Sequence, residues 1–197
     1  MQFKLFGTKI YISFIFAAVI TVMLFFDRTT LFLPCAIAIL LHELGHLFAM
    51  WLCECAPREI KLIPASVQII RGFSSKPYGE SIIALFGPIV NLVIFLVFLV
   101  NYLYFKDEWV IKFGLINLII GIFNLLPVKG LDGGTVLYNI VSEKKGLRTA
   151  ERLLNIITFV SSLTLFILGI FTIINGKVNI TVFIMAIYLL LSVVIKI

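Results

Sequence analysis

Six long runs of apolar residues constrain this chain more than any other feature of its sequence. Each run has about 17–24 residues, enough for a helix to cross roughly 30 Å of hydrocarbon. They cover residues 10–26, 31–52, 81–104, 109–126, 153–174 and 178–195. Only 13% of the residues are charged and 61% are hydrophobic, which excludes a soluble enzyme, a disordered tail and a nucleic-acid-binding domain. We therefore expect an all-α polytopic membrane protein with six transmembrane helices, in which residues 1–197 form a single domain.

The basic residues fall mainly on one side of the predicted membrane. If the N-terminus is in the cytoplasm, 12 of the 16 Lys and Arg residues lie in inward-facing segments. Cytoplasmic loops carry such an excess in membrane proteins. We therefore expect both termini to be cytoplasmic, and we attribute the +6 net charge to this bias and not to a nucleic-acid-binding surface. The Ile-, Phe-, Lys- and Asn-rich composition suits a low-GC bacterium, so we expect the spans to lie in a bacterial cell membrane.

Two stretches between the predicted spans have other patterns. Residues 59–72 are β-branched, partly alternating and interrupted by Pro64, which predicts a short strand or hairpin at the cytoplasmic membrane surface. Residues 135–145 follow a Gly-Gly turn and predict a short helix that ends near Gly146.

The second apolar run contains an acidic residue and both histidines of the chain. An ionisable side chain inside a span costs about 2.5–3.5 kcal/mol, so Glu43 indicates a functional site. With His42 and His46 it forms H-E-x-x-H, the signature of a zinc site. On a helix, positions i and i+4 are about 40° apart, so both imidazoles can bind one tetrahedral ion while the glutamate reaches a water on that ion. The alternative is a pair of buried histidines hydrogen-bonded between helices; we favour the metal site because all three residues share one span.

Zinc requires a third protein ligand and an open position for water. The chain has no third histidine, and Asp132 is the best candidate, in the segment 124–134 that follows the fourth run. Pro127 ends that run and three glycines loosen the backbone around the aspartate. The alternative role for Asp132 is the N-cap of the following helix; we favour the metal because a two-histidine site lacks a ligand. Glu54 and Glu80, at the ends of spans, are weaker candidates.

The third and fourth runs contain small and polar residues at helical spacing. Pro88 frees a backbone carbonyl and allows a kink, and Asn91 shares a helix face with Gly87. Close helix packing is the alternative explanation for such residues. We predict that Asn91 and Asn124 line the metal cavity and hold the backbone of a substrate, and that Gly87 and Pro88 also line the cavity or bind substrate. For Asn117 both explanations stay open.

These motifs together resemble the site-2 protease family, the intramembrane zinc metalloproteases of peptidase family M50. The resemblance rests on HELGH (42–46), GPIVN (87–91) and NLLPVKGLDGG (124–134), in that order on successive runs, and it covers residues 31–134. It implies that His42, His46 and Asp132 bind one zinc ion and that Glu43 activates water.

The layout is most similar to the branch of stage IV sporulation protein FB, which cuts a membrane-associated sigma-factor precursor. The 197 residues contain neither the CBS domain found in much of that branch nor the PDZ domain of other branches. The resemblance therefore covers the core chemistry and does not extend to ATP-linked regulation or PDZ gating.

The expected function is that of an intramembrane zinc metalloendopeptidase, which cleaves a peptide bond in or near the membrane segment of a protein substrate. Residues 60–71 are expected to present the substrate in extended form, because the peptide bonds of a helix are shielded. The expected partners are the lipid bilayer, a membrane-associated protein substrate such as a transcription-factor precursor, and a regulatory membrane protein or a second copy of the chain; nucleic acid is not among them.

One alternative is a membrane zinc transporter, which would need a chain of polar ligands through the spans. The other is a catalytically dead relative that binds clients, against which the intact Glu43 argues.

Overall fold

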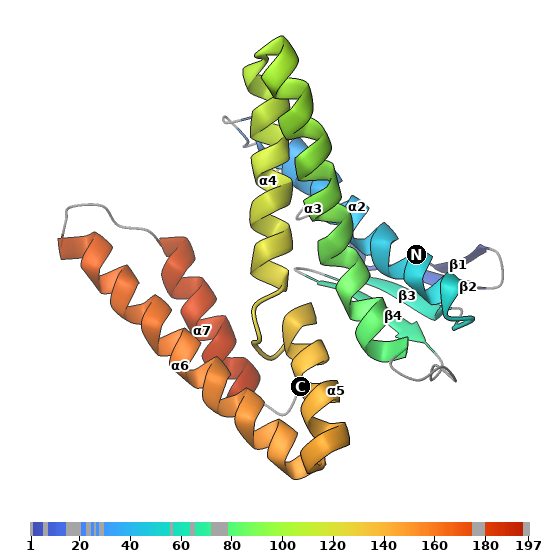
Figure 1. Cartoon of the computed structure of the whole chain (residues 1–197), viewed down its shortest axis with the longest axis vertical. Coiled ribbons are helices and arrows are strands. Elements are labelled where there is room, and N and C mark those ends of the chain that lie inside the picture. Colours follow the sequence, from blue (N-terminus) through green and yellow to red (C-terminus); the bar gives the residue numbers. More distant parts are fainter. Residues whose placement is uncertain are drawn as a thin grey trace. The chain divides into compact units, whose positions relative to one another are not determined.

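The structure is a computed structural model. It describes residues 2–5, 8–14, 21–22, 25, 27, 30–55, 57–63, 66–71, 79–174 and 180–194. The chain divides into two compact units, Met1–Phe123 and Asn124–Ile197, each with its own elements. In Figure 1 the first unit runs from blue through green to yellow, and the second from yellow to red.

The first unit contains the helices α2 (Phe32–Leu52), α3 (Gly79–Phe105) and α4 (Glu108–Asn124, whose last residue begins the second unit). Small residues bring these helices close together. A Cβ on Gly45 of α2 would lie 2.7 Å from the Phe86 carbonyl oxygen of α3. A Cβ on Gly121 of α4 would lie 3.2 Å from the Pro88 carbonyl oxygen. Figure 1 shows α3 and α4 running side by side in opposite directions.

The first unit also contains a four-stranded sheet in the order β1-β2-β3-β4. Its strands are β1 (Gln2–Leu5), β2 (Thr8–Ile12), β3 (Pro57–Ile63) and β4 (Ser66–Arg71). β2 runs antiparallel to β1 and parallel to β3, whereas β3 and β4 are antiparallel, with Ile60 opposite Ile69. β3 begins two residues before the stretch 59–72, for which the sequence predicts a strand or hairpin, and β4 lies within it. β4 is at one edge of the described sheet.

The first predicted span, residues 10–26, is wrong at its start. Residues up to Ile12 belong to β2, where Ile10 is opposite Ile60 of β3. The segment TKIYI alternates and is β-branched, which favours a strand, but its apolar residues also extend the apolar run that follows. Most of the remainder of this span lies outside the described residues.

The second unit contains α5 (Asp132–Lys145), α6 (Leu147–Ile174) and α7 (Ile180–Val194). Gly146 ends α5 in the left-handed region, with φ +83°, and α6 begins at the next residue. α6 and α7 are joined by the fully buried Ser162, whose hydroxyl donates to the Ala186 carbonyl oxygen at 2.7 Å. α5 therefore extends the predicted helix 135–145 by three residues at its start and ends where the sequence predicts.

Among the described residues, α2, α3 and α6 are long and apolar enough to cross a membrane, and α7 contains the shorter apolar segment Val182–Leu191. Large aliphatic side chains on α3, such as Leu96 and Val97, are more than half exposed. Such surfaces are expected where a helix faces lipid. The chain is therefore a predominantly helical membrane protein, and six spans stay a prediction.

Candidate metal centre

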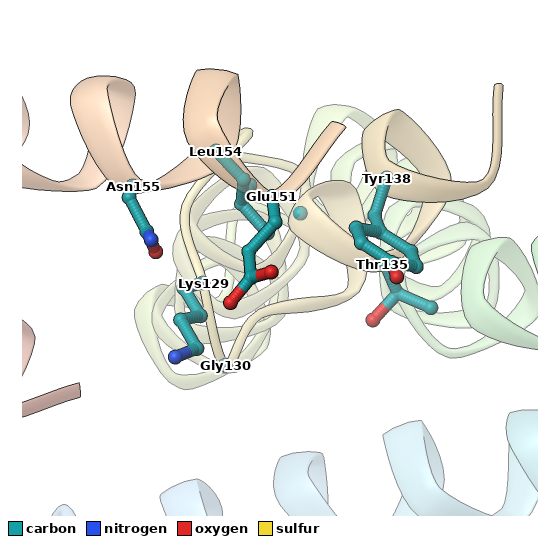
Figure 2. A pocket seen from close by; sticks show the side chains of 8 residues that line it. Lys129, Gly130, Thr135, Tyr138, Glu151, Leu154 and Asn155 are labelled. Carbon is teal, nitrogen blue, oxygen red and sulfur yellow. The ribbon is translucent and has the colours of Figure 1, made fainter. Parts of the chain in front are cut away.

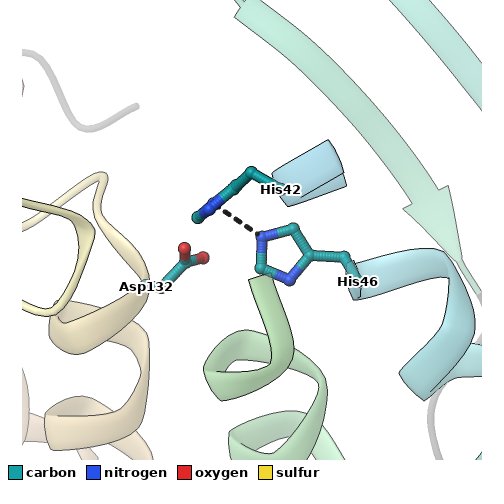
Figure 3. Close-up of side chains that lie close together, drawn as sticks. All are labelled: His42, His46 and Asp132. Carbon is teal, nitrogen blue, oxygen red and sulfur yellow. Dashed lines mark hydrogen bonds between the residues drawn. The ribbon is translucent and has the colours of Figure 1, made fainter. Parts of the chain in front are cut away.

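The two histidines lie one turn apart on the buried face of α2. His42 is 5% exposed and His46 is 8% exposed. Their Nε2 atoms are 3.2 Å apart and their rings are nearly perpendicular, with an interplanar angle of 87°. Figure 3 shows the two rings turned toward each other, as the i and i+4 spacing predicts.

In both histidines a hydrogen bond at Nδ1, the ring nitrogen that faces away from the pair, fixes the tautomer. His46 Nδ1 is 2.8 Å from the Ile83 carbonyl oxygen, which can only accept, so Nδ1 carries the proton. His42 Nδ1 is 2.6 Å from Asn91 Oδ1. The amide orientation of Asn91 follows from its Nδ2, which donates to the Ala38 carbonyl oxygen at 3.1 Å. Both neutral histidines therefore keep a lone pair on Nε2.

This arrangement fits a metal cation. Two Nε2 lone pairs that face each other repel, whereas a cation between them is bound by both. Zinc–nitrogen bonds of about 2.0–2.1 Å at a tetrahedral angle place two nitrogens about 3.3 Å apart, and the observed separation is 3.2 Å. In zinc proteins a ligating histidine commonly donates its second N–H to a carbonyl or carboxylate oxygen, as both of these do. The residues present therefore fit zinc.

Gly87 gives the histidines their space. A Cβ at this position would lie 2.5 Å from His46 Nε2 and 2.8 Å from His42 Nε2. α3 can pass the two rings only because it has no side chain there. The next residue, Pro88, lies inside α3 and is buried. Gly87 is therefore close to the histidines, and contact of Gly87 and Pro88 with a substrate stays a prediction.

The other predicted residues of the first unit occupy different positions. Asn91 is fully buried, and its amide is bonded to His42, Ala38 and Asn117. We therefore interpret it as a residue that orients His42, and a contact with substrate stays a prediction. Glu43 is half-buried on α2 beside His42, which is compatible with the predicted role of base.

Asp132 and Asn124 belong to the second unit. Asp132, also labelled in Figure 3, is the first residue of α5, where the helix dipole favours a carboxylate. The N-cap is Leu131, and it makes no side-chain capping bond, so Asp132 is not the N-cap that the alternative required. Gly133 and Gly134 allow α5 to begin there, because a Cβ on either would collide with the carbonyl groups of the preceding turn. Asn124 is half-buried at the end of α4, and its role stays a prediction.

Sequence reasoning missed one partner of the histidines, the Ile83 carbonyl oxygen, and left open the role of Asn117, which contacts Asn91. The Ile83 carbonyl oxygen left no signal, because any residue supplies a carbonyl. Asn117 did leave one: it is an amide in the middle of an apolar run, at helical spacing from two glycines. The structure shows that its Oδ1 accepts from Asn91 Nδ2 at 2.9 Å.

A pocket of about 410 Å³ lies within the second unit, and sequence reasoning did not predict it. It is lined by Lys129, Gly130, Gly134, Thr135, Tyr138, Glu151, Leu154 and Asn155 (Figure 2). Thr135 lies one turn after Asp132 on α5, so the pocket borders the helix that carries the predicted ligand.

Comparisons with known proteins agree with a protease fold. A model of peptidase family M50 matches residues 107–168. A zinc metalloprotease of Methanocaldococcus jannaschii is 30% identical over 156 residues, which cover 73% of this chain and 46% of the relative. A Synechocystis protein named as a zinc metalloprotease is 31% identical over 126 residues, which cover 58% of this chain and 33% of the relative. The chain thus spans less than half the length of these relatives.

One solved structure is similar along nearly the whole chain. It is the site-2 protease from Methanocaldococcus jannaschii, with a TM-score of 0.71 and 24% sequence identity. The match covers 98% of this chain and 93% of that structure. At this identity the match establishes the fold.

Proposed function

This chain belongs to peptidase family M50, and from that premise we propose that it is an intramembrane zinc metalloendopeptidase. It would cleave a peptide bond in or near the membrane segment of a protein substrate. The observation that carries the proposal is the histidine pair on α2, whose Nε2 lone pairs converge at 3.2 Å inside an apolar helix. A pair of histidines that served packing alone would not need two Nε2 lone pairs that face each other.

Asp132 is the proposed third ligand. His42, His46 and Asp132 each offer one ligand atom, and two histidines with a carboxylate are a donor set that catalytic zinc sites use. Asp132 is the first residue of α5 and directly follows the turn before that helix. This position at the end of a helix supports the role of a ligand. Ligands would then come from both units, which would act as a single metalloprotease domain.

The chemistry divides between the ion and the protein. A zinc ion held by His42, His46 and Asp132 would lower the pKa of a water to about 7 and polarise a peptide carbonyl. Glu43 accepts a proton from the attacking water on a carboxylate oxygen and delivers it to the leaving amine. The water oxygen bonds to the carbonyl carbon, and the C–N bond breaks. His42 and His46 keep their Nδ1 protons throughout, because those protons are held by Asn91 and Ile83.

The sheet supplies a means of holding the substrate. A peptide bond inside a helix is shielded, so the substrate must become extended before cleavage. β4 is an edge strand, and an extended segment can pair with its outer edge and satisfy its freed backbone groups there. We place this sheet and both termini on the cytoplasmic side of a bacterial cell membrane, in a six-span topology, because the basic residues concentrate there.

The two alternatives have less support. A zinc transporter would need polar ligands along a path through the spans, and relatives named as zinc metalloproteases favour the protease. A catalytically dead relative would not need Glu43, whose place inside a span is costly.

Two matched variants test the proposal in purified protein, with cleavage of a panel of transmembrane peptides and zinc content as the readouts. Glu43→Gln should bind zinc and lose about 10²–10⁴-fold in cleavage rate, because glutamine cannot accept a proton. Asp132→Asn should lose cleavage and zinc affinity together, because a ligand charge is removed. If Glu43→Gln cleaves like the wild type, the mechanism is wrong; if Asp132→Asn keeps full zinc affinity, Asp132 is not a ligand.

A further inference from the structure

Asn117 is a buried amide in the middle of α4 with no place in the chemistry described so far. It is 0% exposed. Its Nδ2 donates to the Phe113 carbonyl oxygen at 2.9 Å, and its Oδ1 accepts from Asn91 Nδ2, also at 2.9 Å. Burying an amide in an apolar helix is unfavourable unless its polar atoms find partners. Helix packing alone would be served by an apolar side chain of the same size.

Hydrogen bonds continue from Asn117 to the histidine pair. Asn91 Nδ2 has two acceptors, Asn117 Oδ1 on α4 and the Ala38 carbonyl oxygen on α2. With both of its N–H groups engaged, Asn91 can present only its oxygen to His42 Nδ1, at 2.6 Å. One line of buried hydrogen bonds thus connects α4, α3 and α2 and ends on His42.

We propose that Asn117 is a positioning residue that sets the tautomer of His42 through Asn91. If Asn117 Oδ1 is lost, one Asn91 N–H loses its acceptor, and of the two acceptors only the Ala38 carbonyl oxygen still opposes a turn of the amide. A turned amide would place an N–H against His42 Nδ1, which would then have to accept. The proton would move to Nε2, and His42 could no longer offer that atom to a metal.

The neighbours of Asn117 support a specific role. Gly121, one turn further along α4, lets the two helices approach closely, since a Cβ there would lie 3.3 Å from the Asn91 Cβ. His46 is held by a backbone carbonyl, which cannot turn over, so it needs no such support. The proposal therefore concerns His42 and leaves His46 unaffected.

Two readouts test this inference. The first is independent of the proposed metal function of His42, and the second rests on it. The first readout is ¹⁵N NMR of the metal-free protein with labelled histidine, in detergent. The chain has two histidines, so the spectrum contains two pairs of ring nitrogens. They can be assigned with His42→Gln. The second readout is zinc affinity by competition with a chelator.

Two variants of similar size separate hydrogen bonding from packing. Asn117→Leu removes the acceptor, and we expect it to move the His42 proton from Nδ1 to Nε2 and to weaken zinc binding about 10–100-fold. Asn117→Asp in its protonated form can accept from Asn91 and donate to Phe113, so it should keep the wild-type tautomer. Ser162→Ala, which removes a buried interhelical hydrogen bond of the second unit, is the control and should change neither readout.

Each outcome has a defined meaning. If Asn117→Leu leaves the His42 tautomer unchanged, the proposal is overturned, even if zinc affinity falls. If Asn117→Leu does not fold, Asn117→Ala takes its place with the same expectation. If the tautomer responds but the wild type binds no zinc, the positioning role stands and the proposed metal function fails.

Discussion

Replacing Gly87 by alanine tests the geometry of the histidine pair directly. The new Cβ would lie 2.5 Å from His46 Nε2 and 2.8 Å from His42 Nε2, whereas ordinary contact begins at 3.4 Å. Neither ring can retreat freely, because hydrogen bonds of 2.6 and 2.8 Å hold both Nδ1 atoms. The rings or α3 must therefore move by about 0.6–0.9 Å, the difference between these distances.

That displacement is large for a metal site. Zinc–ligand distances are expected to hold within about 0.2 Å. Overpacking of a tight site typically costs about 1–3 kcal/mol, which corresponds to about a 5–150-fold loss in zinc affinity. The stability of helix α3 should increase at the same time, because alanine is favoured over glycine inside a helix by about 1 kcal/mol. The variant should therefore stay folded while its metal site is damaged.

The measurement is zinc affinity by chelator competition, with helix content measured in the same samples. Gly114→Ala is the control on α4, since its Cβ would lie 3.2 Å from the Phe98 Cβ, a much smaller overlap than the one at Gly87. We expect Gly87→Ala to bind zinc about 10–100-fold more weakly and Gly114→Ala to bind it as the wild type does. Wild-type zinc affinity in Gly87→Ala would refute the inference that α3 bounds the metal site.

Two further predictions concern the surroundings of the site. Val67→Pro or Ile69→Pro in β4 should reduce cleavage and leave zinc content intact, because proline removes a backbone donor from the strand; unchanged cleavage would argue against substrate pairing there. Reporter fusions after Ile197 and in the α3–α4 connection at residues 106–107 should report cytoplasmic and outward locations respectively, and the reverse result would overturn the orientation.

Sequence patterns were sufficient for features that depend only on residues close together in the chain. The i and i+4 spacing of His42 and His46 places both imidazoles on one face of any helix, so the pair could be predicted without knowledge of the fold. Apolar run length similarly predicted α2 and α3 closely. It failed at residues 10–12, because an apolar run cannot distinguish a strand that pairs with distant residues from the start of a span.

Only the tertiary structure decided how the histidines are held. The partner of His42 Nδ1 is 49 residues away in the chain and that of His46 Nδ1 is 37 residues away, and both lie on α3. The sequence contains Asn91 and Asn117 but not their connection, because a hydrogen bond between helices depends on the rotation and separation of both. Ile83 contributes through its carbonyl oxygen, which every residue has. The sequence by itself therefore determined which side chains can bind a metal, and the packing of α2, α3 and α4 decided which nitrogen of each histidine faces it.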